Sequence, residues 1–302
     1  MKTVRVFAPA KINLTLHITG QRDDGYHLLD SLVTFATVGD QLYLTEAGVF
    51  SLTVEGPEAE GVPADMDNLA LKAAHFAGAG REAAITLTKN LPSSSGIGGG
   101  SADAAAAWRG MLMLGEDGDT QADTQFQMPD IMLETQVHAL STLGADVPMC
   151  VASRPLRARG IGEKITFHSL PPLFAVLVNP RVPVSTPEVF KRLASKSNMA
   201  MPESLPDFEN AAAMIEWLKT QRNDLEAPAI ENAPVIGEVL ARLGDLPNLG
   251  LARMSGSGAT CFALFDNETD AKVAARELYA ERPDWWVAGC VLQDMFLPSL
   301  PR

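Results

Sequence analysis

The stretch KNLPSSSGIGGGSADAAAAWRGM (residues 89–111) places four glycines and four serines within nine residues and then continues into a block of alanines. Each glycine would weaken a helix or a strand by about 0.5–1 kcal/mol relative to alanine. Alanine, by contrast, is the strongest helix former. The pattern therefore predicts a glycine-rich loop that opens a helix.

A loop of this kind is suited to binding phosphate. The first turn of a helix has N–H groups without internal partners, and the helix dipole adds partial positive charge there. Glycine removes the Cβ atoms that would hold a phosphate away from these groups. A flexible Gly/Ser linker is the alternative, but the apolar helix that follows at once argues against it. The Walker pattern and the protein-kinase motifs are absent from the sequence. The dinucleotide fingerprint is absent too, because Ser101 stands where it needs its third glycine.

The composition is that of a soluble globular protein, with 302 residues, 46% hydrophobic and 20% charged. A net charge of −13 argues against nucleic acid and anionic membranes as partners, so a phosphate site must use local N–H groups, a few cations and Mg²⁺. No apolar run approaches the ~18–20 residues of a membrane span. The apolar stretch of MKTVRVFAPAK (residues 1–11) is too short for a signal peptide and predicts a strand. We expect a cytoplasmic protein.

Periodicity and capping residues predict the main elements. Alternating apolar residues in KINLTLHITG (residues 11–20) predict a strand. Asp67 is the expected N-cap of one helix and Thr186 that of another. Residues 131–153 predict a helix, a turn and a short strand, and the polar residues 113–130 a surface connection. Cys150, Cys261 and Cys290 are odd in number and lie in apolar contexts, which indicates buried free thiols.

Several motifs together resemble one enzyme superfamily. They are PAKINLTLHITGQRDDGYH (residues 9–27), LPSSSGIGGGSADAA (91–105), LGADVPMCV (143–151), RNDLE (222–226) and MSGSGATCFALF (254–265). Their order and spacing resemble the GHMP kinases, named for galactokinase, homoserine kinase, mevalonate kinase and phosphomevalonate kinase. The likeness covers nearly the whole chain. The glycine loop indicates the superfamily, and DGYH with GADVP is more specific.

The resemblance implies a fold and a reaction. It implies a mixed α/β (α+β) fold with an N-terminal glycine-loop domain, residues 1–160, and a ferredoxin-like C-terminal domain, residues 161–302. Within the superfamily the motifs are most similar to those of the kinases that act on cytidine diphosphate methylerythritol in isoprenoid precursor biosynthesis. ATP, with Mg²⁺, would phosphorylate the 2-hydroxyl of that small-molecule substrate. No oligomeric state is indicated.

The resemblance also assigns a catalytic pair. Asp146 would accept the proton of the reacting hydroxyl, although a turn aspartate bonded to its own backbone is the structural alternative. Lys11 would lie beside Asp146 and stabilise charge on the phosphoryl oxygens, where the alternative is an exposed strand lysine. Asn13, two residues along the same strand face, would bind substrate hydroxyls.

The remaining assignments concern the two nucleotides. Tyr26 would stack on the cytosine, His27 would hydrogen-bond its edge, Phe190 would cover its other face and Thr186 would lie on the same side. For Tyr26 the alternative is a hairpin aromatic at the core edge, and for Thr186 a helix cap. The expected ATP-binding residues are Asn68, Pro92, Gly96, Gly98, Gly99, Gly100 and Ser101.

Two departures from the family pattern bear on the loop. Ala102 and Asp103 replace a common Ser-Asn, and a carboxylate in the first turn of a phosphate-binding helix would repel phosphate unless it points away. Ser94 and Ser95 stand where glycines are common. No metal ligand can be assigned from the sequence. Another GHMP kinase, of the homoserine or mevalonate type, and a non-catalytic nucleotide-binding protein on the same fold remain the alternatives.

Overall fold

A computed structural model describes residues 2–115 and 138–302, so residues 116–130 of the expected surface connection and residues 131–137 of the expected helix lie outside the described part. The elements in chain order are β1 (Thr3–Asn13), β2 (His17–Gln21), β3 (His27–Ala47), β4 (Ser51–Glu55), α1 (Leu69–Ala77), β5 (Glu82–Thr88), α2 (Gly99–Gly115), α4 (Val147–Ala152), β6 (Leu156–Gly160), β7 (Lys164–Phe167), β8 (Leu173–Asn179), α5 (Thr186–Lys191), α6 (Ala211–Lys219), α7 (Glu226–Asn232), α8 (Val235–Gly244), β9 (Leu251–Met254), β10 (Cys261–Phe265), α9 (Glu268–Glu281), β11 (Trp286–Gln293) and α10 (Phe296–Ser299).

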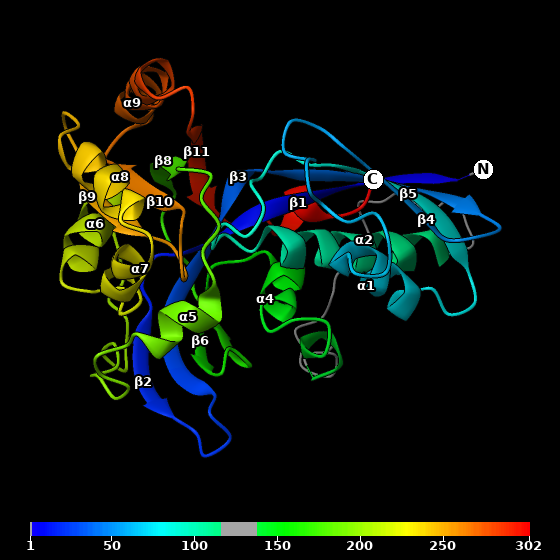
Figure 1. The fold of residues 1–302 in the computed structure, drawn as a ribbon, viewed down its shortest axis with the longest axis horizontal. Helices are drawn as coiled ribbons and strands as arrows, with labels where there is room; N and C mark the ends of the chain where they lie inside the picture. Colours follow the sequence, from blue (N-terminus) through cyan, green and yellow to red (C-terminus); the bar gives the residue numbers. More distant parts are fainter. Residues whose placement is uncertain (1, 116–137) are drawn as a thin grey trace.

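The 21-residue strand β3 organises the fold. Strand β5 pairs with the last residues of β3 and β11 with Phe35 and Ala36, both on the edge opposite β1, and the hydrogen-bonded path through the sheet runs β4-β5-β3-β11-β8-β10-β9. The first half of β3 also pairs with β2 and β6, while β1 runs antiparallel along most of the rest. Because one strand crosses both halves of the molecule, the two halves share a single sheet (Figure 1).

Helix α2, which follows the glycine loop, forms the centre of the first half. It packs on β1 and β3, and α1 packs against α2 (Figure 1). Nearly every residue of α2 is buried, which suits its run of small alanines. The close fit is plain at Gly110, where a Cβ atom would lie 2.6 Å from a methyl carbon of Leu44. The helix that presents the loop is thus fixed by core packing.

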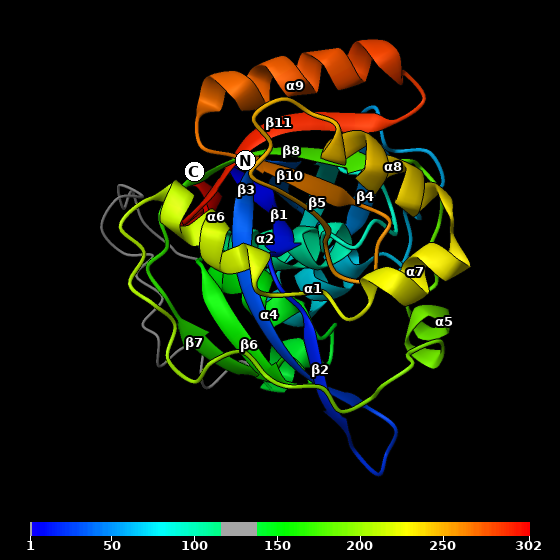
Figure 2. The same cartoon turned by 90° about the vertical axis from the view of Figure 1, so that its left-hand side faces the viewer.

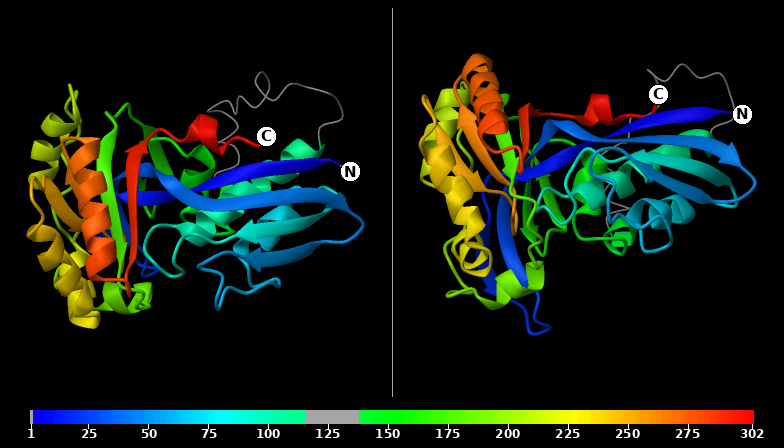
Figure 3. Two further views of the ribbon diagram at one scale, coloured as in Figure 1. Left: turned by 90° about the horizontal axis from the view of Figure 1, so that it is seen from above. Right: turned by 45° about the horizontal axis from the view of Figure 1, so that its top comes forward.

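In the second half, helices cover the strands β8 to β11. Helix α9 packs on β8 and β11 and α8 on β9 and β10, so they form a layer over this part of the sheet (Figures 2 and 3). The core between them includes Val178, Ile236, Phe265 and Leu278. In the described part of the chain, no helix is both long enough and apolar enough to cross a membrane.

Both expected helix caps were wrong by one residue. Asn68, not Asp67, caps α1, with its side chain accepting a hydrogen bond from the N–H of Ala70. The N–H of Asp67 is instead bonded to the carboxylate of Asp65 in the preceding turn. Ser185, not Thr186, precedes α5. Either neighbour has the chemistry of a cap, so only the path of the chain selects one.

Two strand predictions also need correction. Residues 147–152 form the helix α4, because Pro148 presets a helical φ and a short apolar run has no period that separates strand from helix. The strand expected over residues 11–20 is interrupted at residues 14–16, where the N–H groups of Leu14 and Thr15 both donate to the carbonyl of Leu32. The predicted boundary at residue 160 stays a prediction. Cys150 and Cys261 are buried free thiols as expected, and Cys290 is half-buried.

Candidate active site

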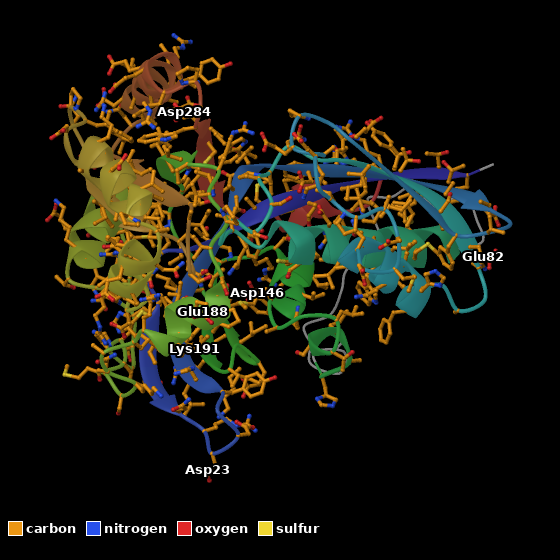
Figure 4. The ribbon with its side chains drawn as sticks, viewed as in Figure 1. Asp23, Glu82, Asp146, Glu188, Lys191 and Asp284 are labelled. Carbon is orange, nitrogen blue, oxygen red and sulfur yellow. The ribbon has the colours of Figure 1, made fainter. Side chains whose placement is uncertain are left out.

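A cavity of about 1260 Å³ lies where the two halves meet. All fourteen residues singled out from the sequence line it; their individual roles stay predictions. They are Lys11, Asn13, Tyr26, His27, Asn68, Pro92, Gly96, Gly98, Gly99, Gly100, Ser101, Asp146, Thr186 and Phe190. Figure 4 places Asp146 near the middle of the molecule, with Glu82 at the right-hand end and Asp284 at the upper left. The fold therefore brings residues far apart in sequence to one place.

The glycine loop needs glycine for two separate reasons. Gly96 and Gly98 have positive φ angles, 74° and 66°, which side chains rarely adopt. At Gly96 a Cβ atom would also lie 2.5 Å from the carbonyl oxygen of Gly258, so the loop passes directly against the loop of residues 255–258. Helix α2 begins at Gly99, and Gly99, Gly100 and Ser101 form its first turn at the cavity wall. This is the arrangement expected of a phosphate cradle.

Lys11 and Asp146 form an ion pair in this cavity. The Nζ of Lys11 lies 2.9 Å from Oδ2 of Asp146, and the two side chains are 5% and 36% exposed. Asp146 occupies the N-cap position of α4, yet its side chain makes no capping bond. The structure thus argues against a turn aspartate bonded to its own backbone. The carboxylate remains open to a ligand on the cavity side.

Strand β1 holds Lys11 and Asn13 on the same side. Lys11 Nζ donates to Oδ1 of Asn13 at 2.8 Å, and Asn13 Nδ2 donates to the hydroxyl of Ser31 at 2.8 Å. The backbone N–H of Lys11 donates to the carbonyl of Ile97 in the glycine loop at 2.9 Å. These bonds fix the distance between the ammonium and the loop, which suits groups that must act on one phosphate.

Aromatic side chains gather at another part of the cavity. The rings of His27 and Phe190 are in contact, with centroids 4.8 Å apart and planes tilted by 30°. Tyr26 is 62% exposed beside them. Nε2 of His27 is buried without a hydrogen-bond partner among the described residues. Burial, together with the charge of Lys196, lowers the pKa of His27, so the ring is neutral at pH 7 and its free nitrogen can meet a polar ligand.

Asn68 and Thr186 line the cavity, but their side chains form hydrogen bonds with other parts of the protein. Asn68 Oδ1 caps α1, and its Nδ2 donates to the carbonyl of Pro63 at 2.8 Å. The hydroxyl of Thr186 lies 2.7 Å from the hydroxyl of Ser257. Both residues thus shape the wall, Asn68 by ordering the segment before α1 and Thr186 by joining α5 to the loop of residues 255–258.

Sequence reasoning missed a second lysine at the loop. Lys89 is buried and pairs with Asp103 and with Asp40. This pairing answers the concern raised by Asp103, because its carboxylate turns to Lys89 instead of standing free in the phosphate site. The only local signal was that Lys89 and Asp103 bracket the loop; Asp40 is 49 residues from Lys89. At the other departure, Ser94 adopts a φ of 51°, a conformation that explains why glycine is common there.

The comparisons with known proteins agree with this geometry. Residues 68–154 match the GHMP kinase N-terminal domain and residues 201–284 the GHMP kinase C-terminal domain. The chain is 50% identical over 302 residues, all of it and 97% of the relative, to the 4-diphosphocytidyl-2-C-methyl-D-erythritol kinase of Roseobacter denitrificans. It is 53% identical over 288 residues, 95% of the chain and 94% of the relative, to the enzyme of that name from Dinoroseobacter shibae.

A solved structure extends the likeness to three dimensions. The crystal structure of a 4-(cytidine 5'-diphospho)-2C-methyl-D-erythritol kinase superposes with a TM-score of 0.70 at 32% identity, covering 96% of this chain and 99% of that one. The mixed α/β fold with its glycine loop is therefore that of the superfamily, as expected. Identity near one half over the full length is enough to place a chain within one family. The chain belongs to the 4-diphosphocytidyl-2-C-methyl-D-erythritol kinases, a family of GHMP kinases.

Proposed function

We propose that the chain transfers the γ-phosphoryl group of ATP to the 2-hydroxyl of 4-diphosphocytidyl-2-C-methyl-D-erythritol, a step in isoprenoid precursor formation. The observation that carries the proposal is the Lys11–Asp146 pair, which stands in one cavity with the first turn of α2 and the aromatic cluster. A phosphate cradle at one part of the cavity and an aromatic cluster at another match a donor nucleotide and an acceptor nucleotide. A site for homoserine or mevalonate would have no use for the aromatic cluster.

Each part of the site has a role in the transfer. The hydroxyl oxygen attacks the γ-phosphorus, the bond to the bridging oxygen of ADP breaks, and the hydroxyl proton passes to Asp146. The Lys11 ammonium stabilises charge on the moving phosphoryl group. N–H groups in the first turn of α2 hold the ATP phosphates. A non-catalytic nucleotide binder would not need a cation and a base paired at 2.9 Å beside a phosphate cradle.

The donor set fits a Mg²⁺ ion carried mainly by the nucleotide. Among the described residues no three acidic, histidine or cysteine side chains converge as a metal site. Mg²⁺ usually keeps several waters and takes only one or two carboxylates plus phosphate oxygens. The Ser101 hydroxyl and the Asp146 carboxylate are two of the oxygen groups of the cavity wall that would serve. When bound, the ion would neutralise charge on the ATP phosphates.

On the acceptor side, the free nitrogen of His27 would hydrogen-bond the cytosine edge, and Tyr26 and Phe190 would supply ring faces. Asn13 would orient the hydroxyls of the methylerythritol chain next to Lys11. The test is a coupled kinase assay with ATP and 4-diphosphocytidyl-2-C-methyl-D-erythritol, run beside homoserine and mevalonate. We expect ADP release only with the cytidine substrate, and ³¹P NMR should show a phosphate monoester at position 2. Turnover of homoserine or mevalonate instead, or ATP binding without turnover, would contradict the proposal.

A further inference from the structure

We propose that Lys89, Asp40 and Asp103 are positioning residues for ATP, a buried clamp that joins the two ends of the glycine loop and holds the first turn of α2 in place. The inference rests on the proposed function, because it takes the loop to be the ATP phosphate site. None of the three is placed in contact with substrate. We call this trio the loop clamp.

The contacts of the loop clamp span the loop. Lys89, the residue after β5, donates from Nζ to Oδ2 of Asp103 at 2.8 Å, and Asp103 lies in the first turns of α2. The same ammonium forms a short ion pair with Oδ2 of Asp40 on β3. The three side chains are at most 4% exposed. One buried cation therefore fastens the start of the loop, its end and the central strand to one another.

Asp40 also holds the backbone that leads into the loop. Its Oδ1 accepts hydrogen bonds from the N–H groups of Asn90 at 2.6 Å and Leu91 at 2.9 Å. Asn90 in turn donates from its side chain to the carbonyl of Gly39 at 3.1 Å. Asp40 pairs with Ala8 of β1, the strand that carries Lys11. The loop clamp thus sets the loop in a fixed position relative to the Lys11 ammonium.

The ammonium lies directly behind the phosphate cradle. A Cβ atom on Gly99 would be 3.6 Å from Nζ of Lys89, an ordinary contact distance. Lys89 and Asp103 both line the cavity, but Lys89 is only 3% exposed and two of its hydrogen bonds go to carboxylates. Lys89 therefore acts on bound phosphate through the position of Gly99 and its neighbours.

A merely stabilising role explains this cluster poorly. Buried ions lose much of their attraction to the cost of desolvation, and apolar residues of similar volume often stabilise as well or better. Here two carboxylates share one cation, and Oδ1 of Asp103 is buried without a partner among the described residues. Burial and Asp40 raise the pKa of Asp103 to about 8 against the pull of Lys89. A proton held there limits negative charge beneath the phosphates.

The experiment compares the ATP KM of three variants with that of the wild type. Asp103→Ala frees the end of the loop but leaves the Lys89–Asp40 pair balanced, so the protein should fold. Because a shift of about 1 Å in a positioned group can cost ~100-fold in rate, we expect the ATP KM to rise about 10-fold or more, with the KM for the cytidine substrate unchanged. Asp103→Asn can still accept from Lys89 through its amide oxygen, and it should keep an ATP KM near that of the wild type. Lys89→Met should raise the ATP KM at least as much as Asp103→Ala.

The matched control is Arg157→Met. Arg157 forms an equally buried pair with Asp30, 1% and 3% exposed, and its other hydrogen bonds go to the carbonyls of residues 201–203. The Arg157→Met variant should have a lower melting temperature than the wild type and an unchanged ATP KM. Calorimetric titration with ADP gives a second measure of binding that does not depend on turnover. If Lys89→Met fails to fold, Asp103→Ala decides alone.

The outcomes separate the two proposals. If the wild type turns over the cytidine substrate but folded Asp103→Ala keeps the wild-type ATP KM, the loop clamp is not a positioning device. The same conclusion follows if Arg157→Met raises the ATP KM as much as the clamp variants do. If the wild type neither binds ADP in the calorimetric titration nor forms ADP in the coupled kinase assay, the proposed function itself fails.

Discussion

The chain contains two lysine–aspartate sites within one cavity wall, and they differ mainly in exposure. Lys11 and Asp146 meet at 2.9 Å with a third of the carboxylate open to the cavity. Lys89 meets Asp103 at 2.8 Å, and neither side chain is more than 4% exposed. The same pair of chemical groups can therefore serve two purposes. An open pair can exchange a proton with a ligand, whereas a sealed pair can only hold other parts of the chain in place.

The largest effect should come from breaking the open pair. Asp146→Asn keeps the shape but removes the proton acceptor, so kcat should fall about 10²–10⁴-fold with a modest change in KM. The kcat of Lys11→Met should fall by a similar factor. The loss of kcat in the double variant should be smaller than the two single losses combined, because the two residues act as a unit. Steady-state kinetics on the folded variants checks this. A kcat within a few-fold of the wild type would make Asp146 a structural turn residue.

The second prediction tests Gly99, the first residue of α2, which lies beside Lys89. A Cβ atom there meets its nearest neighbours at 3.6–3.8 Å, so the fold should tolerate a side chain. The larger Val would still enter the space where phosphate approaches the first turn of α2. We expect Gly99→Val to lose about 100-fold or more in ATP affinity, with a circular dichroism spectrum like that of the wild type. Wild-type ATP affinity in a folded variant would separate the loop from phosphate binding.

The third prediction uses the unpartnered polar atom of the open region, Nε2 of His27. Cytosine and uracil present different groups at position 4 and at N3, and a buried polar group left without a partner costs about 1–3 kcal/mol. His27→Ala should reduce the preference for the cytidine over the uridine substrate by about 10-fold. Tyr26→Ala and Phe190→Ala should raise KM for both substrates about equally. An unchanged cytidine-to-uridine ratio of kcat/KM would remove His27 from base recognition.

The last prediction concerns the unpartnered atom of the sealed site, Oδ1 of Asp103, and it is a prediction about stability and not about catalysis. The pKa of Asp103 is raised from 3.8 to about 8 by burial and by Asp40, so between these values the folded protein holds a proton that the unfolded chain has released. Its contribution to the free energy of unfolding therefore falls as pH rises through this window. Asp103→Asn cannot titrate, so its unfolding free energy in urea should fall less between about pH 5 and pH 8. Parallel curves for the two proteins would contradict the raised pKa.

The local sequence was enough to predict the features that depend on neighbouring residues. Alternation over residues 11–20 marked the strands β1 and β2, and the change from glycine to alanine near residue 100 marked the start of α2. Lys11 and Asp146 were identified through short motifs that resemble those of a superfamily. Such signals exist because periodicity, turn conformation and helix propensity act over a few residues.

The tertiary structure decided which groups meet. Nothing near Lys89 in the sequence indicates Asp40, 49 residues away, and nothing in the segment VPMCVA (residues 147–152) separates helix from strand. Nor could the sequence show that the Asn68 side chain caps α1 while its amide nitrogen holds Pro63. A buried charge takes whatever partner the packed core places within reach, because leaving it unpaired costs more than any local preference can offset. The open pair was therefore visible in the motifs, whereas the sealed one became visible only in the fold.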